Sequence, residues 1–385
     1  MDLPEELIAE IISRTPVRTI VSCKSVCKRW CNIVSEPFFS RLHLSISSKM
    51  LLLHQGDAED VDDDNDGDLA VVELDDQHRQ HDIHHEPMMR FSPGLALGDY
   101  VGLIGSVNGL ICLEDSYDDS AYVCNPITQE YIRLQDSEYT RVSYLKGYYG
   151  FGLVESNQQY KIVRFYKGRF PSTEYDLGSE VYTLGTGMWR DLGHVPFHLN
   201  EHDRGHYVSG RLHWLAGELI CAFDLDRELF RPMEAPPRAP GNTDHFSILG
   251  VHNHFRNLGV LKGCLCICDI TLYSELSIWV KRDYGVEDSW SKKLIITPNP
   301  PLHEGINTDM VRLLKVLKDG NILMYCDQLQ LFTYHPQHKT LRHHIFPEGE
   351  FLTFGAMTYV PGFISLERSF TLEGVKRWES PQVED

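Results

Sequence analysis

The sequence lacks the features that mark exported and membrane-spanning proteins. No run of about 18 apolar residues occurs in its 385 residues, so no segment is expected to cross a bilayer. The opening residues, MDLPEELIAEI, carry acids where a secretory signal carries bases, and no Asn-x-Ser/Thr acceptor occurs. We therefore expect a cytoplasmic or nuclear protein, or one in both places, whose 10 cysteines are reduced thiols.

The sequence also lacks the short motifs of common enzyme classes. It contains no Gly-x-Ser-x-Gly, no phosphate loop, no His-Glu-x-x-His and no dinucleotide fingerprint, so we expect neither catalysis nor a cofactor. Basic residues are scarce, because 36 Lys and Arg face 55 Asp and Glu, a net charge of −19. No basic stripe occurs either, so nucleic acid is not an expected partner.

Most of the acidity lies in one segment. Residues 56–86 hold 13 acids against one Arg, which accounts for −12 of the net charge. This composition, poor in aromatic residues, predicts a disordered acidic connector over residues 46–94. Within it, Asp62 to Glu73 (DDDNDGDLAVVE) fits the pattern of a calcium loop, but a run so dense in Asp matches by chance, and a solvated spacer is favoured. Four nearby histidines without an ordered scaffold are not predicted to bind metal: His78, His81, His84 and His85.

Helical periodicity dominates the first 45 residues. Asp2 with Glu5 indicates one helix start, and Thr15 before Pro16 indicates a second with Thr15 as its N-cap. Glu36-Pro37 ends the run, because proline disfavours a helical residue before it. The apolar residues at helical spacing are Leu3, Leu7, Ile8, Ile11, Ile12, Val17, Ile20, Val21, Cys23, Cys27, Trp30, Cys31 and Val34.

The stretch CKSVCKRWC places three cysteines four residues apart around Trp30. Cys23 and Cys31 would lie about 12 Å apart along an ideal helix, too far to share one tetrahedral metal. No His or fourth Cys at metal-finger spacing accompanies them. Reduced cysteine behaves as a small apolar residue, so packing is favoured over a metal or redox site.

So short a segment cannot bury apolar residues on several faces by itself, and an exposed apolar patch usually marks a partner. The residues Leu3 to Leu44 resemble an F-box of the plant type. The resemblance is carried by Leu3-Pro4, Pro16-Val17-Arg18, Val26-Cys27-Lys28, Trp30, Pro37 and Phe38. One departure is Thr15, where the family usually has leucine.

The resemblance implies a three-helix domain that binds a Skp-type adaptor and, through it, the cullin of a ubiquitin ligase. The adaptor-binding residues that it implies are Leu3, Pro4, Leu7, Ile11, Pro16, Val17, Ile20, Val26, Cys27 and Trp30. Each could instead be core of the domain itself. For Ile8 and Cys23 we favour packing.

Beyond Leu95 the sequence consists of short apolar or alternating runs separated by Gly, Pro, Asn and Asp, which predicts antiparallel strands. About five units of strand, glycine turn and strand recur, and each is followed by a second strand pair. This repeat predicts a β-propeller of four-stranded blades, which the final strands of 354–366 could close; a large β-sandwich is the alternative.

The same region resembles the F-box-associated domain that follows plant F-boxes. The matching motifs are Val107 to Cys112, Asn125 to Thr128, Tyr160 to Val163, Val181 to Arg190, Gly210 to Leu215, Phe223 to Leu225 and Ile278 to Val280. Two further sets are interpreted as strand packing: the tryptophans Trp189, Trp214, Trp279 and Trp290, and the alternating cysteines Cys264, Cys266 and Cys268.

The predicted fold class is therefore α+β and multidomain, with a small helical F-box before a large all-β, propeller-like domain. The expected boundaries are 1–45 for the F-box, 46–94 for the connector, 95–370 for the β domain and 371–385 for a tail. The function that the resemblance implies is recruitment of an unknown target protein to the ligase, without catalysis, metal or membrane. The alternatives are a scaffold outside a ligase, a ligand-binding propeller and a hydrolytic propeller.

Overall fold

The structure is a computed structural model of the whole chain. The residues it describes are 3–57, 68–73, 89–91, 101–115, 120–137, 148–167, 177–199, 204–237, 254–271, 275–286, 289–296, 311–326, 330–344, 351–370, 372 and 374–378. No helix in this part of the chain is long and apolar enough to cross a membrane. The acidic stretch Asp62 to Gly67 and the four clustered histidines lie outside the described residues.

The N-terminal segment forms four helices, where three were expected. They are α1 (Glu5–Ser13), α2 (Val17–Val26), α3 (Lys28–Ser35) and α4 (Pro37–Ile46). Cys27 separates α2 from α3 because its backbone is extended, and Glu36 is extended in the same way before Pro37. Proline at the first helical position then starts α4. Thr15 does not cap α2: its hydroxyl donates to the carbonyl of Ile12, 2.8 Å away.

The rest of the chain forms a six-bladed β-propeller, so the sandwich alternative is wrong. The first blade is β24 (Phe351–Tyr359), β1 (Met50–Asp57), β2 (Asp68–Val72) and β3 (Met89–Phe91). The second is β4 (Val101–Val107), β5 (Leu110–Asp115), β6 (Ala121–Asn125) and β7 (Glu130–Arg133), with β25 (Lys376–Arg377) on its outer edge. The third is β8 (Tyr149–Val154), β9 (Gln159–Lys167), β10 (Leu177–Thr183) and β11 (Trp189–His194).

The last three blades follow the same order. The fourth is β12 (His206–Val208), β13 (Arg211–Ala216), β14 (Leu219–Asp224) and β15 (Leu229–Glu234). The fifth is β16 (His254–Leu261), β17 (Cys264–Thr271), β18 (Glu275–Lys281) and β19 (Trp290–Ile296). The sixth is β20 (Val311–Val316), β21 (Ile322–Cys326), β22 (Gln330–His335) and β23 (Thr340–His344). All pairings within these blades are antiparallel.

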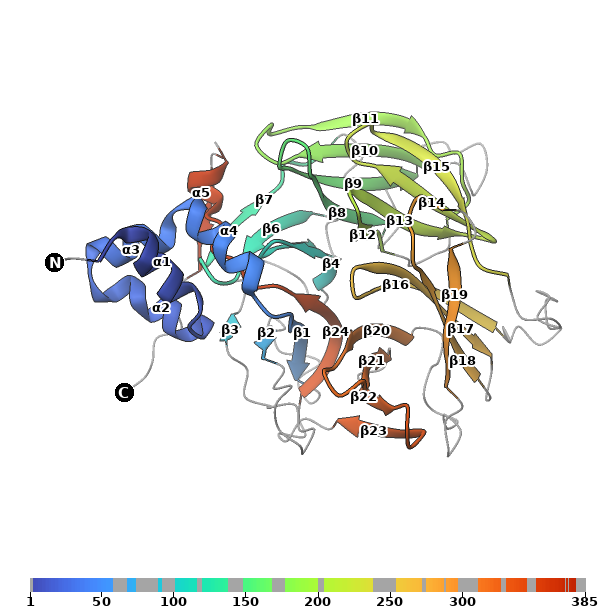
Figure 1. Cartoon of the computed structure of the whole chain (residues 1–385). Coiled ribbons are helices and arrows are strands. Elements are labelled where there is room, and N and C mark those ends of the chain that lie inside the picture. The colour runs from blue at the N-terminus through green and yellow to red at the C-terminus, as the bar shows by residue number, and fades with distance from the viewer. Residues whose placement is uncertain are drawn as a thin grey trace.

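The first blade closes the ring by joining the two ends of the domain. The C-terminal strand β24 pairs with β1, with Leu52 opposite Met357. Around the centre, β24, β4, β8, β12, β16 and β20 lie next to one another in that order and return to β24 (Figure 1). Closure of this kind completes the first blade with strands from both ends of the domain, and only the short outer strand of each blade remains as an edge.

The disordered connector expected for 46–94 is corrected, because this range contains the three strands β1, β2 and β3. The side chains of Leu51 to Leu53 in β1 and of Leu69 to Val71 in β2 are all fully buried. One face of β1, with Leu52, packs toward the helices and the second blade, and the other, with Leu51 and Leu53, packs against the sixth blade. Burial on both faces explains why its apolar residues are continuous and do not alternate. The second half of the calcium-loop pattern is therefore a core strand.

The glycine turns of the repeat are confirmed as tight hairpins. Asn108 and Gly109 join β4 to β5 with φ of 51° and 88°, as a two-residue turn of the primed type requires. A side chain at Gly109 would also clash with the backbone of Gly362, 2.5 Å away. The same left-handed pair, with a glycine second, recurs between β12 and β13 and between β16 and β17.

Tryptophans and cysteines pack between strands and blades, as predicted. Trp214 is fully buried and meets the ring of Phe165 edge to face, with centroids 4.9 Å apart, across the third and fourth blades. Trp279 and Trp290 lie against the core between the fourth and fifth blades, while Trp189 lies against that of the second and third. Cys266 and Cys268 are buried in β17, beside the half-buried Cys264.

Candidate functional site

The surface of the four helices is unusually apolar. Of the eleven exposed large hydrophobic side chains among the described residues, six lie on this segment: Leu3, Leu7, Ile11, Val26, Phe38 and Ile46. Leu7 and Ile11 are four residues apart in α1, so they lie on one side of that helix, and Leu3 lies two residues before its start. They are 53, 46 and 59% exposed, and we call these three residues the apolar stripe.

The α2–α3 connection adds to this surface beside the stripe. Arg29 at the start of α3 donates from Nη2 to the carbonyl oxygen of Leu3, 2.8 Å away, and from Nε to Glu5, 3.2 Å away. These bonds hold the start of α3 against the N-terminal end of the stripe. Val26 and Cys27, which directly precede α3, are both exposed.

The structure separates the predicted adaptor-binding residues into two groups. Seven are exposed and one, Trp30, is half-buried; the seven are Leu3, Pro4, Leu7, Ile11, Pro16, Val26 and Cys27. Val17 and Ile20 are corrected, because they are 6 and 0% exposed and lie on the buried face of α2, in the core. Ile8 and Cys23 are buried, as predicted.

Phe38 and Ile46 are exposed apolar residues of the helices that the predicted adaptor-binding set does not include. Both lie on α4, which packs against α1 and α3. Phe38 and Phe39 are adjacent in the sequence, yet Phe38 is 51% exposed and Phe39 is fully buried. Helical spacing from Phe39 and His43, both buried, was the signal that would have placed Phe38 outside.

The three clustered cysteines do not act as one group. Cys23 is buried and burial raises the pKa of its thiol, whereas Cys27 is exposed and Cys31 is half-buried. The packing interpretation is therefore confirmed for Cys23 and wrong for Cys27, which points to the surface. Among the described residues, no group of three or more His, Cys, Asp or Glu is placed to hold a metal.

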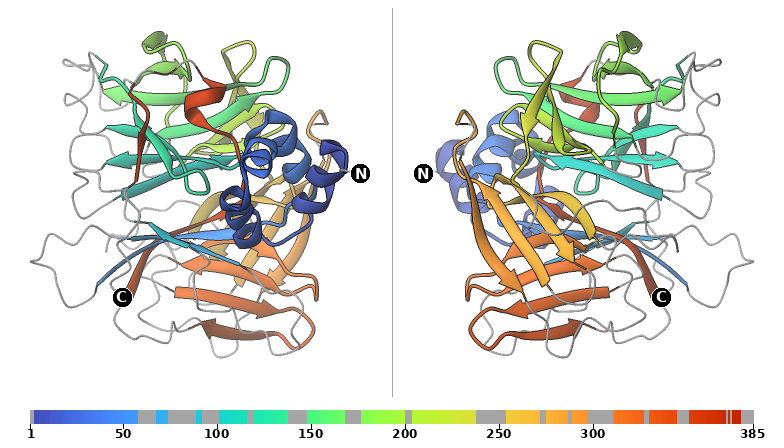
Figure 2. Two further views of the ribbon diagram at one scale, coloured as in Figure 1. Left: turned by 90° about the vertical axis from the view of Figure 1, so that its left-hand side faces the viewer. Right: turned by 90° about the vertical axis from the view of Figure 1, so that its right-hand side faces the viewer.

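The helices and the propeller share one core. Phe39 of α4 meets Phe363 edge to face at 5.5 Å, and His43 meets the same ring at 4.9 Å. The ammonium of Lys24 lies 5.9 Å from the centre of that ring. Burial lowers the pKa of both His43 and Lys24. Both views in Figure 2 show the helices against one side of the ring, where this core continues into the first two blades.

The C-terminal segment, expected to be a tail from residue 371, reinforces this junction. The buried carboxylate of Glu130 accepts from the backbone amide of Leu366 at 2.6 Å and from Arg377 at 3.2 Å. Trp378 is 8% exposed and stacks on Tyr131 at 5.6 Å. The segment is therefore anchored to the outer edge of the second blade at residues 376–378.

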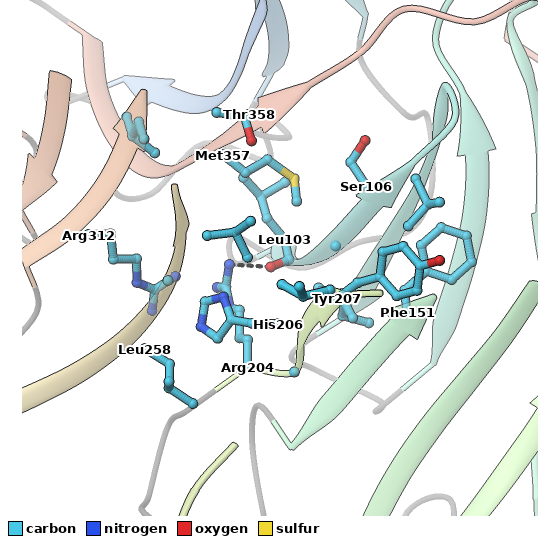
Figure 3. A pocket seen from close by; sticks show the side chains of 18 of the residues that line it. Leu103, Ser106, Phe151, Arg204, His206, Tyr207, Leu258, Arg312, Met357 and Thr358 are labelled. Carbon is cyan, nitrogen blue, oxygen red and sulfur yellow. Dashed lines mark hydrogen bonds between the residues drawn. The ribbon is translucent and has the colours of Figure 1, made fainter. Parts of the chain in front are cut away.

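A cavity of about 390 Å³ occupies the centre of the propeller. Its walls come from all six inner strands, including Leu103 of β4, Phe151 of β8, His206 of β12, Leu258 of β16 and Met357 of β24. Figure 3 shows the side chains of Arg204, His206 and Arg312 directed into it. The sequence does not reveal this cavity, because its lining residues come from strands as far apart in the chain as those of Leu103 and Met357.

Comparison with known families agrees with both parts of the structure. A model described as F-box domain matches residues 1–42, and a model described as F-box associated beta propeller domain matches residues 65–354. The F-box protein At3g07870 of Arabidopsis thaliana is 28% identical over 379 residues, which covers 87% of this chain and 85% of that protein.

Two further relatives from Arabidopsis thaliana span most of the chain. The F-box/kelch-repeat protein At3g23880 is 28% identical over 339 residues, covering 84% of this chain and 85% of its own length. The F-box protein CPR1 is 30% identical over 324 residues, covering 75% of this chain and 72% of its own. The solved structure of apo AztD from Citrobacter koseri has a TM-score of 0.39 at 10% identity, over 78% of this chain and 83% of that one.

Proposed function

Because the chain belongs to the plant F-box proteins with an F-box-associated β-propeller, we propose that it is the substrate-recognition subunit of an SCF-type ubiquitin ligase. In this proposal the helices bind a Skp-type adaptor, and through it a cullin, while the propeller binds a target protein. The chain itself contributes proximity and no catalytic group: it holds target lysines near a ubiquitin-charged enzyme.

The observation that carries the proposal is the apolar stripe with the exposed residues beside it. A folded chain gains nothing by leaving Leu3, Leu7 and Ile11 in water, so a partner that covers them is the simplest reason for their exposure. We propose the adaptor-binding surface as these three with Pro4, Pro16, Val26, Cys27 and Trp30.

The shared core of helices and propeller supports a receptor that holds its target at a fixed distance from the ligase. A flexible connection would let the target drift with respect to the ligase. Here Phe39, His43 and Phe363 are in contact, and the C-terminal segment is bonded to the second blade. Such a junction holds the adaptor-binding and target-binding parts in one orientation, which raises the effective concentration of target lysines.

Reconstituted ubiquitin transfer tests the ligase role directly. The chain is mixed with adaptor, cullin, RING subunit, charged conjugating enzyme and ubiquitin, and modification of its own lysines is followed on gels. We expect modification by wild type and none by the Leu7→Asp, Ile11→Asp double variant. Adaptor binding without any transfer would contradict the ligase role and favour the scaffold alternative.

A further inference from the structure

Among the lining residues that the structure describes, the charged side chains of the central cavity are all basic, opposite in sign to the net charge of the chain. The basic residues that line it are Lys49, Arg204, His206 and Arg312, and none of the lining residues that the structure describes is Asp or Glu. The chain as a whole carries −19. Cations gathered inside a strongly acidic protein indicate a local site for an anion.

The cationic side chains approach one another from different blades. Figure 3 shows the guanidinium of Arg312, from β20, directed across the cavity toward the imidazole of His206, from β12, with Arg204 beside it. Arg204 donates to the carbonyl oxygen of Leu103, which fixes its side chain on the wall. All three are half-buried, so their charges are less screened than on an open surface.

A buried histidine lies close enough to Arg204 to respond to its charge. His54 of β1 is 1% exposed, and burial together with the nearby charge of Arg204 lowers its pKa to about 4. His54 is therefore neutral at physiological pH. The positive charge on this side of the cavity belongs to Arg204.

Apolar walls surround these cations. Leu103, Leu258 and Met357 line the same space, and a cavity of about 390 Å³ holds one or two side chains of an inserted segment. Apolar walls lower the local dielectric and strengthen the attraction for an anion. A long polyanion such as RNA or a membrane surface would meet the repulsion of the whole acidic chain, whereas a single inserted loop would not.

We propose that this central cavity, which we call the cationic cavity after Arg204, His206 and Arg312, binds an anionic side chain presented on a peptide segment of the target. The inference rests on the proposed function, because it assigns the target-binding site of that receptor. The guanidinium of Arg312 pairs with the anion and the apolar walls contact the neighbouring residues of the segment. A carboxylate and a phosphate both satisfy this chemistry.

The test uses the full chain and three fluorescein-labelled peptides in fluorescence anisotropy. The probes are hexaglutamate, a glutamine peptide of equal length and the same glutamine peptide with one phosphoserine. The variant is Arg312→Gln, and the matched control is Arg282→Gln, an exposed arginine next to β18 that does not line the cavity. Melting temperature verifies that each variant is folded.

We expect wild type and Arg282→Gln to bind an acidic peptide, and Arg312→Gln to bind it at least about tenfold more weakly. Rising salt should weaken the binding, and the glutamine peptide should not bind. Preference for hexaglutamate identifies a carboxylate, and preference for phosphoserine identifies a phosphorylated target.

Absence of binding to either anionic peptide, or equal binding by folded Arg312→Gln, overturns the inference. Adaptor binding is measured on the same samples. Its retention in Arg312→Gln separates failure of this site from failure of the receptor proposal.

Discussion

Adjacent residues of α1 should respond to substitution in opposite ways. Ile11 is 59% exposed on the apolar stripe, whereas Ile12, the next residue, is 3% exposed in the core. Replacing Leu7 and Ile11 together by alanine should leave the free energy of unfolding within about 0.5 kcal/mol for each change, because neither packs in the core. Ile12→Ala should lower it by about 2–5 kcal/mol.

The same pair of changes should weaken adaptor binding strongly. Covering a partly exposed leucine or isoleucine removes apolar surface worth roughly 1–2 kcal/mol, so the double variant loses about 2–4 kcal/mol of binding free energy. That loss corresponds to a rise in Kd of about 30- to 1,000-fold. Any folded fraction of Ile12→Ala should bind the adaptor as wild type does.

Titration calorimetry with a purified Skp-type adaptor gives the Kd, and urea unfolding gives the stability. A double variant that unfolds like wild type and binds with an unchanged Kd would refute the assignment of the stripe. A double variant that loses stability by several kcal/mol would also refute it, because the stripe would then belong to the core.

Three further predictions concern the core. Phe363→Ala should cost about 3–5 kcal/mol by removing the contact with Phe39, and hydrogen exchange in α4 should speed up; unchanged exchange would contradict a shared core. Trp214→Ala should cost about 3–5 kcal/mol in urea unfolding, because its ring fills the space against Phe165; a loss below 1 kcal/mol would be inconsistent with that packing. His213 has a pKa lowered by burial from 6.5 to about 4, so the unfolded chain binds more protons between these values. Stability should therefore fall as pH drops through this window, by up to about 3 kcal/mol, and His213→Gln should flatten the fall; an equally steep profile in that variant would contradict it.

In the helical part, the spacing of apolar residues predicted some of the buried positions but not all of them. The spacing of Ile8 and Ile12 correctly placed apolar residues on one side of a helix. It could not decide that Val17 and Ile20 face inward while Val26 faces outward, because α2 contacts helices and shares a core with the propeller. Which apolar residues remain exposed depends on neighbours far away in the sequence, such as Phe363.

In the propeller, local features were predicted from the sequence, whereas long-range pairings were not. Local turn chemistry, such as Asn108-Gly109, predicted the hairpins, and their repetition predicted the propeller. The first blade was missed because β1 borders an acidic segment and pairs with β24, about 300 residues later in the chain. The cationic cavity was not predicted for a similar reason: Arg204 and Arg312 belong to the fourth and sixth blades and line one cavity only in the folded propeller.

Formation of a stoichiometric complex with a Skp-type adaptor tests the central claim most directly. Full-length chain and adaptor are mixed at micromolar concentration and separated by size-exclusion chromatography with light scattering. We expect a one-to-one complex for wild type and separate peaks for the folded Leu7→Ala, Ile11→Ala double variant. Separate peaks for wild type, with the chain folded, would contradict it.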